Sequence, residues 1–308
     1  MMKTDSKLEK ILASGQLAVT GECGPPRGAR PEKVKEKTEM LRGYVDLVNV
    51  TDNQTAMVRM SSWAGSVIIK QMGIEPLLQM VCRDRNRLAM QADIIGAYSL
   101  GVNTMLCLSG DHPRFGDHPQ ACNVFDLDSV QLIQMVAKMR DEGKFQGGKD
   151  IDNPPKMFIG AAANPFADPY ELRVMRLAKK VNAGVDFIQT QCIFNLPKFE
   201  KYMEEVCRRG LHEKVYIMAG ITPIKTAGAA RYMKSKVPGM DVPDEIVKRM
   251  EGVPKEKQAE EGVKIAVESI QRLKEVEGVA GFHIMAIEWE AIVPDIVKQA
   301  GLYPRPEV

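Results

Sequence analysis

The nine residues from Asn103 to Asp111, NTMLCLSGD, decide how this chain folds. Residues 103–107 are largely apolar and predict a buried strand. Gly110 then allows the backbone to turn, and Asp111 is the first charged residue beyond the strand. In an α/β protein, an acid at this position points into the mouth where ligands bind. The plainer alternative is that Asp111 only caps the segment that follows.

The same pattern, a short apolar run followed by a longer amphipathic segment, repeats along the whole chain. Strands are predicted at residues 17–22, 45–50, 76–81, 103–108, 156–163, 185–191, 214–219 and 280–287. Helices are predicted at residues 31–41, 61–71, 87–100, 129–140, 170–182, 197–208, 226–235 and 261–277, with one or two short ones within 241–261.

Eight strands alternating with helices favour an α/β fold, the (β/α)8 TIM barrel, as a single domain over residues 1–308. The main alternative is an open, doubly wound sheet, but no GxGxxG motif follows any predicted strand. Residues 141–155 are polar and rich in Gly and Lys, and they predict an exposed insertion.

Composition narrows the classes of partner. The 308 residues are 44% hydrophobic and 27% charged, with a formal net charge of +2, so nothing indicates a nucleic-acid partner. No apolar run approaches the roughly 18 residues of a membrane span, and residues 1–10 are too polar for a signal peptide, so we expect a cytoplasmic protein. The six cysteines form no CxxC pair, and His112 and His118 lack a third ligand at a suitable spacing. We therefore predict no metal site.

Polar side chains gather where the predicted strands end, which in a barrel is the edge that carries the active site. Glu22 ends the first strand beside small residues, and burial would favour its protonated form and suit it as a general acid. The alternative for Glu22 is an ion pair with Arg27 or Arg30. Asp111 would stay ionised and interact with a cofactor. His283, inside the eighth strand, is interpreted as a hydrogen-bonded core histidine.

Five short motifs lie in order on the predicted strands: GECGPP (21–26), VNVT (48–51), LSGD (108–111), NAGVDF running to TQ (182–191) and AGITP (219–223). With these motifs the chain resembles the methylenetetrahydrofolate reductase family over nearly its whole length. The resemblance implies a flavin-binding (β/α)8 barrel, an oxidoreductase of one-carbon metabolism that interconverts 5,10-methylenetetrahydrofolate and 5-methyltetrahydrofolate. It also implies one flavin, FAD or FMN, as cofactor and a tetrahydrofolate derivative as substrate.

The resemblance assigns roles to individual residues. Glu22 matches the general acid that helps open the imidazolidine ring, and Asp111 matches the acid placed between flavin and pterin. Gln191 matches a glutamine that contacts the substrate. The cofactor-binding positions that we expect from the resemblance are Thr51, Gln79, Leu108, Ser109, Gly110, Asp111, Ala162, Asn164, Asp168 and Lys180.

Several of these positions differ from the family pattern. Gln79 lies where the family often has a histidine, and Ser109 replaces the family's usual arginine. Asn164 replaces a tyrosine and Asp168 replaces a histidine. Trp289 replaces an arginine near the eighth strand. With fewer positive groups than the family has near the flavin tail, FAD and FMN both remain open.

The electron donor and the quaternary state remain open as well. Residues 222–228 lack the phenylalanine that commonly stacks on nicotinamide in the family, so the donor is either NAD(P)H or a partner redox subunit. The resemblance leaves homo- and hetero-oligomers open. Two other functions remain: a pterin-binding barrel methyltransferase without flavin, and a flavin-carrying subunit that is inactive without its partner.

Overall fold

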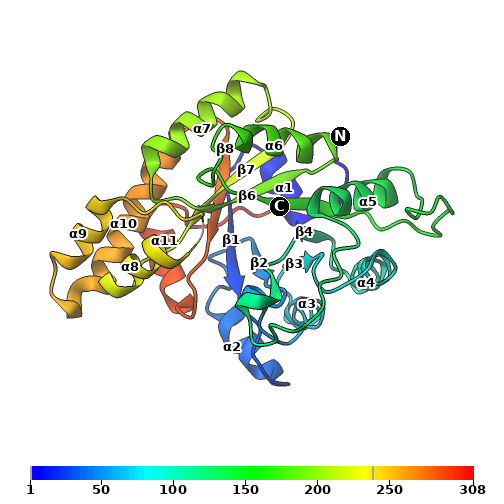
Figure 1. Cartoon of the computed structure of the whole chain (residues 1–308), viewed down its shortest axis with the longest axis horizontal. Helices are drawn as coiled ribbons and strands as arrows, with labels where there is room; N and C mark the ends of the chain where they lie inside the picture. Colours follow the sequence, from blue (N-terminus) through cyan, green and yellow to red (C-terminus); the bar gives the residue numbers. More distant parts are fainter. Residues whose placement is uncertain (1, 238) are drawn as a thin grey trace.

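Eight parallel strands pair in sequence order, and β1 pairs with β8 to close them into a barrel (Figure 1). The computed structural model describes residues 2–237 and 239–308. The strands are β1 (Ala18–Cys23), β2 (Leu47–Val50), β3 (Pro76–Val81), β4 (Thr104–Leu108), β5 (Phe158–Ala163), β6 (Phe187–Cys192), β7 (Tyr216–Ile221) and β8 (Val279–Ile284). The predicted single-domain (β/α)8 TIM barrel is therefore confirmed.

Helices surround the strands, with α8, α9 and α10 gathered on one side of the molecule (Figure 1). Their bounds are α1 (Lys7–Ala13), α2 (Pro31–Glu39), α3 (Ser62–Gln71), α4 (Arg87–Ser99), α5 (Ser129–Asp141), α6 (Leu172–Asn182), α7 (Leu196–Arg208), α8 (Ala227–Lys236), α9 (Asp244–Glu251), α10 (Gln258–Leu273) and α11 (Val293–Gln299). Short 3₁₀ turns are η1 (Gln54–Ala56), η2 (Pro113–Phe115), η3 (Lys255–Lys257) and η4 (Glu290–Ile292). Of the helices that the structure describes, none combines the length and the apolarity needed to cross a membrane.

Local sequence explains where several helices begin. Pro31 occupies the first turn of α2, where its missing N–H costs no hydrogen bond. Asp128 caps α5 in a capping box, because its carboxylate accepts from the Gln131 backbone while the Gln131 side chain accepts from the Asp128 backbone. These signals agree with the predicted starts of both helices.

Helix α1 was not predicted, and it closes the N-terminal end of the barrel. Its residues Leu8, Ile11 and Leu12 are buried in one apolar cluster with the interior side chains Leu47 and Phe187 and others from β1 to β7. Side chains of a helix therefore fill the N-terminal end of the barrel interior together with side chains of the strands. The opposite, C-terminal end is left for polar groups.

Of the predicted insertion at residues 141–155, residue 141 ends α5 and residues 142–155 form an irregular loop. An isolated antiparallel bridge joins Lys144 to Asp150, and the turn between them is exposed at Gly147 and Gly148. Ile151 is buried, so the returning arm of this loop packs against the barrel before β5 begins.

Candidate active site

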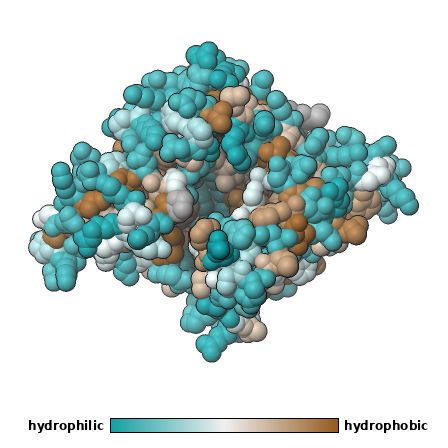
Figure 2. Space-filling view, in the orientation of Figure 1, coloured by the Kyte–Doolittle hydropathy of each residue, from teal (hydrophilic) through white to brown (hydrophobic). Residues whose placement is uncertain are grey.

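A cavity of about 560 Å³ opens at the C-terminal end of the barrel. Figure 2 shows one face of the molecule, largely hydrophilic with apolar patches and hollowed near its centre. Seven of the residues singled out from the sequence line the cavity: Glu22, Gln79, Leu108, Ala162, Asn164, Lys180 and Gln191. They come from β1, β3, β4, β5, β6 and α6 and from the residue just after β5.

A chain of hydrogen bonds crosses the barrel beneath this cavity. Asn49 Nδ2 donates to Gln189 Oε1 over 2.7 Å, and Gln189 Nε2 donates to Thr20 Oγ1 over 3.0 Å. Thr20 Oγ1 lies 2.9 Å from His283 Nδ1. His283 Nε2 in turn lies 3.7 Å from Glu22 Oε2. The chain joins β2, β6, β1 and β8, and it ends at the carboxyl that the sequence singled out.

Thr20 Oγ1 is the common partner in the middle of this chain, because it accepts from Gln189 Nε2 and also bonds to His283 Nδ1. The other ring nitrogen, His283 Nε2, faces the Glu22 carboxyl. His283 is a hydrogen-bonded core histidine, as predicted, and it also lines the cavity beside Glu22.

The alternative role for Glu22 is not formed. Arg27 makes its ion pair with Asp117 on the β4–α5 loop. Among the residues that the structure describes, no ion pair joins Glu22 to Arg27 or Arg30, and the Glu22 side chain is 12% exposed. The carboxyl is therefore available to a ligand in the cavity.

Three cations of α6 form one wall of the cavity: Arg173, Arg176 and Lys180. Burial and, secondarily, the positive charge of Arg176 lower the pKa of Lys180 from 10.5 to about 8. The Lys180 ammonium donates to the Ala162 carbonyl oxygen. A wall of this kind suits an anionic group such as a phosphate.

Arg173, Arg176, Gln189 and His283 were not among the predicted site residues. The two arginines had a signal, because positions 173, 176 and 180 follow the i, i+3, i+7 spacing of one helical face. Gln189 and His283 had none, since their roles depend on contacts between strands far apart in the sequence.

Five predicted cofactor positions lie outside the lining of this cavity: Thr51, Ser109, Gly110, Asp111 and Asp168. The Thr51 hydroxyl is buried and lacks a hydrogen-bond partner within the described residues. Asp168 is exposed, and its carbonyl oxygen accepts from Arg173 Nη2 over 3.0 Å.

Arg83 holds the turn after β4. Its Nη1 donates to the Asp111 carbonyl oxygen over 2.9 Å, and its backbone N–H donates to the Ser109 carbonyl oxygen over 3.1 Å. Gly110 has φ +88°, and a Cβ there would lie 3.0 Å from Val81 Cβ, so the turn needs glycine. The Asp111 residue itself is exposed at the barrel rim.

Known proteins resemble this chain both in sequence and in fold. A family model described as methylenetetrahydrofolate reductase matches residues 7–301. A probable methylenetetrahydrofolate reductase (NADPH) of Caenorhabditis elegans is 23% identical over 96% of this chain and 44% of its own length. The 5,10-methylenetetrahydrofolate reductase of Salmonella typhimurium is 23% identical over 94% of this chain and 93% of its own length.

Among solved structures, an uncharacterized protein from Clostridium thermocellum that binds two copies of 5-methyl-5,6,7,8-tetrahydrofolic acid has the same fold. It aligns with a TM-score of 0.64 and 12% identity, covering 96% of this chain and 98% of that one. The chain spans less than half the length of the worm relative and of two fission-yeast relatives named methylenetetrahydrofolate reductase 1 and 2. Because the family model matches nearly all of its residues, the chain belongs to the methylenetetrahydrofolate reductase family.

Proposed function

We propose that this chain interconverts 5,10-methylenetetrahydrofolate and 5-methyltetrahydrofolate with the help of a bound flavin. The observation that carries the proposal is the position of Glu22, whose carboxyl lines the same cavity as Gln191 and faces His283 Nε2. A proton donor is needed to open the imidazolidine ring, and Glu22 is the acidic side chain that lines this cavity in the described residues.

The residues present fit a flavin, FAD or FMN. Gln79, Leu108 and Asn164 line the cavity at positions where the resemblance expects cofactor contacts. Ala162 and Ala163 leave room at the end of β5, and Arg173, Arg176 and Lys180 would hold phosphate. When bound, the flavin supplies the hydride chemistry that amino-acid side chains lack.

The chain's own residues bind and move protons. Glu22 would give its proton to a ring nitrogen of the folate and take it back in the reverse direction. His283 Nε2 lies beside that carboxyl, and Gln191 would orient the pterin through its amide. We assign to the Asp111 carboxylate the role of stabilising positive charge on the opened substrate. Asp111 lies on the rim loop that Arg83 holds.

We further propose that electrons reach the flavin from a partner redox protein. In the described part of the chain, no Phe, Tyr or Trp lines the cavity, so nothing there stacks on a nicotinamide ring. All six cysteines are free, which suits the reducing cytoplasm where we place the activity.

The proposal is tested by mixing the flavin-loaded protein anaerobically with 5-methyltetrahydrofolate and following the loss of flavin absorbance. We expect the wild type to reduce its flavin, and Glu22→Gln to do so at least about 100-fold more slowly with flavin content unchanged. Glu256→Gln, an exposed carboxyl on η3, is the matched control and should behave as wild type.

Equal rates for Glu22→Gln and the wild type would refute the role of Glu22. A protein that neither contains nor takes up flavin would instead indicate the pterin-binding methyltransferase. A loaded protein that stays inert until a partner is added would indicate the flavin-carrying subunit.

A further inference from the structure

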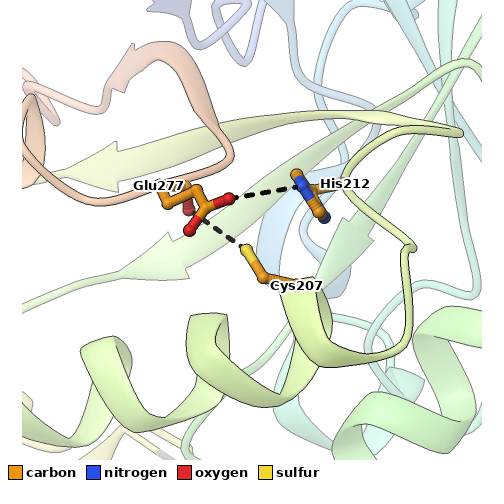
Figure 3. Close-up of side chains that lie close together, drawn as sticks. All are labelled: Cys207, His212 and Glu277. Carbon is orange, nitrogen blue, oxygen red and sulfur yellow. Dashed lines mark hydrogen bonds and ion pairs between the residues drawn. The ribbon is translucent and has the colours of Figure 1, made fainter.

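The end of the barrel opposite the active site carries a second group of reactive side chains. Cys207 ends α7, His212 lies in the loop before β7, and Glu277 lies in the loop before β8 (Figure 3). One ligand atom from each of the three lies within 4.8 Å of the other two. Sequence spacing does not reveal this group, because Glu277 is 65 residues beyond His212.

We propose that Cys207, His212 and Glu277 bind one Zn²⁺ ion, with water completing the coordination. Zn²⁺ is held in proteins by thiolate, imidazole and carboxylate, which are the three groups present here. Mg²⁺ and Ca²⁺ prefer an all-oxygen set and would not use the Cys207 sulfur.

The histidine is free to take a ligand role. His212 Nδ1 is buried and has no hydrogen-bond partner among the described residues, while Nε2 lies 3.7 Å from Glu277 Oε1. The Cys207 thiol donates only to the Glu277 carbonyl oxygen, over 3.5 Å. The contacts that the thiol and Nε2 already make are long, so a bound cation would replace only weak interactions.

The backbone brings the third ligand to the other two. Gly278 has φ +84°, and a Cβ on it would lie 2.9 Å from His212 Cβ and 3.4 Å from Cys207 Sγ. Only glycine therefore allows the loop to pass this close, with Glu277 beside the thiol and the imidazole. Bond lengths of about 2.3 Å to sulfur and about 2.0 Å to nitrogen place ligand atoms ~3.5 Å apart, so the three must close by roughly 1 Å. Rotation of Glu277, whose side chain is 80% exposed, would move its carboxylate inward, and the Cys207 and His212 side chains must turn to bring sulfur and nitrogen together.

The surroundings favour a cation. A cavity of about 360 Å³ beside the cluster is lined by Glu200, Glu204, Glu275 and Glu277 and by one cation, Arg272. Arg272 already pairs with Glu200 over 2.6 Å. The remaining carboxylates leave a negative field around the thiol, which lowers the cost of bringing in a dication.

The ion would fasten α7 to the loop before β8, away from the folate cavity. Its expected effect is therefore on stability, with the chemistry at Glu22 unaffected. This assignment is independent of the proposed function, because none of its residues lines the active-site cavity.

The test uses the full-length protein without an affinity tag, stripped with a chelator and titrated with ZnCl₂ by calorimetry. We expect one equivalent to bind, Co²⁺ to produce a thiolate charge-transfer absorption in its place, and the Tm to rise on Zn²⁺ addition. Cys207→Ser and His212→Gln should each weaken Zn²⁺ binding at least tenfold and remove the Tm rise, and Cys207→Ser should also remove the cobalt–thiolate band.

Cys122→Ser is the matched control, because Cys122 is exposed on the β4–α5 loop and should leave binding unchanged. Circular dichroism of each variant confirms that the barrel has folded. No stoichiometric binding by the wild type, or equal weakening by Cys122→Ser and Cys207→Ser, would overturn the assignment.

Discussion

At the scale of single residues, we expect Lys180 to make the binding of an anion depend on pH. Burial and Arg176 lower its pKa to about 8, so the free protein loses this charge above that pH. Because an anionic phosphate binds the protonated form, we expect flavin affinity to fall as the pH rises beyond about 8, by at most tenfold per pH unit. Fluorescence titration of the stripped protein with its own flavin measures this. Lys180→Arg keeps its charge over the whole range and should lose the pH dependence.

Thr20 is the central link of the hydrogen-bond chain under the active site. It is fully buried, accepts from Gln189 Nε2 and bonds to His283 Nδ1. Thr20→Val keeps the shape but leaves both partners unsatisfied, so we expect a loss of about 1–3 kcal/mol in the free energy of unfolding. Urea unfolding measures the change, and Thr20→Ser should recover most of it. A Thr20→Val protein as stable as wild type would show that the bonds contribute nothing.

At the scale of elements, α1 contributes stability through its buried face. Leu8 is fully buried at the N-terminal end of the barrel, whereas Leu88 on α4 is 75% exposed. We expect Leu8→Ala to lower the free energy of unfolding by about 2–5 kcal/mol, because it removes apolar contacts and leaves a cavity. Leu88→Ala is the same chemical change on a solvated helix and should alter stability by about 0.5 kcal/mol or less. If Leu8→Ala and Leu88→Ala lowered the free energy of unfolding equally in a urea titration, the result would contradict a stabilising role for the buried face of α1.

Helices and strands whose own residues carry a clear pattern could be predicted from the sequence. The apolar run of β3 and the capping residues of α5 are read without knowledge of tertiary contacts, and both elements lie where predicted. Helix α1 is only seven residues long, and its three apolar side chains sit among charged ones. Its helical state depends on burial against seven strands, which no local pattern expresses.

At the scale of the whole molecule, the chain alone is expected to be a poor NADH oxidase. Among the described residues, no Phe, Tyr or Trp side chain lines the cavity to stack on a nicotinamide. We expect the flavin of the purified protein to stay oxidised over minutes with excess NADH or NADPH, while dithionite reduces it at once. Stopped-flow absorbance follows the reaction, and rapid bleaching by either nucleotide would exclude the need for a partner.

Closure of the barrel explains which parts of the candidate site could be predicted from the sequence. Glu22 was singled out because a parallel barrel brings the strand ends to one rim, Gln191 was expected from the family resemblance, and both line the cavity. The partnership of Glu22 with His283 joins the first strand to the last, and only closure of the sheet creates it. Asp111 was chosen by the same rule, and its residue lies exposed on the rim loop.

Helix α1 also sets an order of events during synthesis. It leaves the ribosome before the strands, yet the cluster that buries it includes Leu106 of β4 and Met218 of β7. At about 5–20 residues per second, the roughly 200 residues between α1 and β7 take on the order of ten to forty seconds to translate. Over that interval Leu8, Ile11 and Leu12 have no finished surface to cover them. The nascent α1 segment is thus where we expect a chaperone to bind, and its release would coincide with completion of the seventh strand.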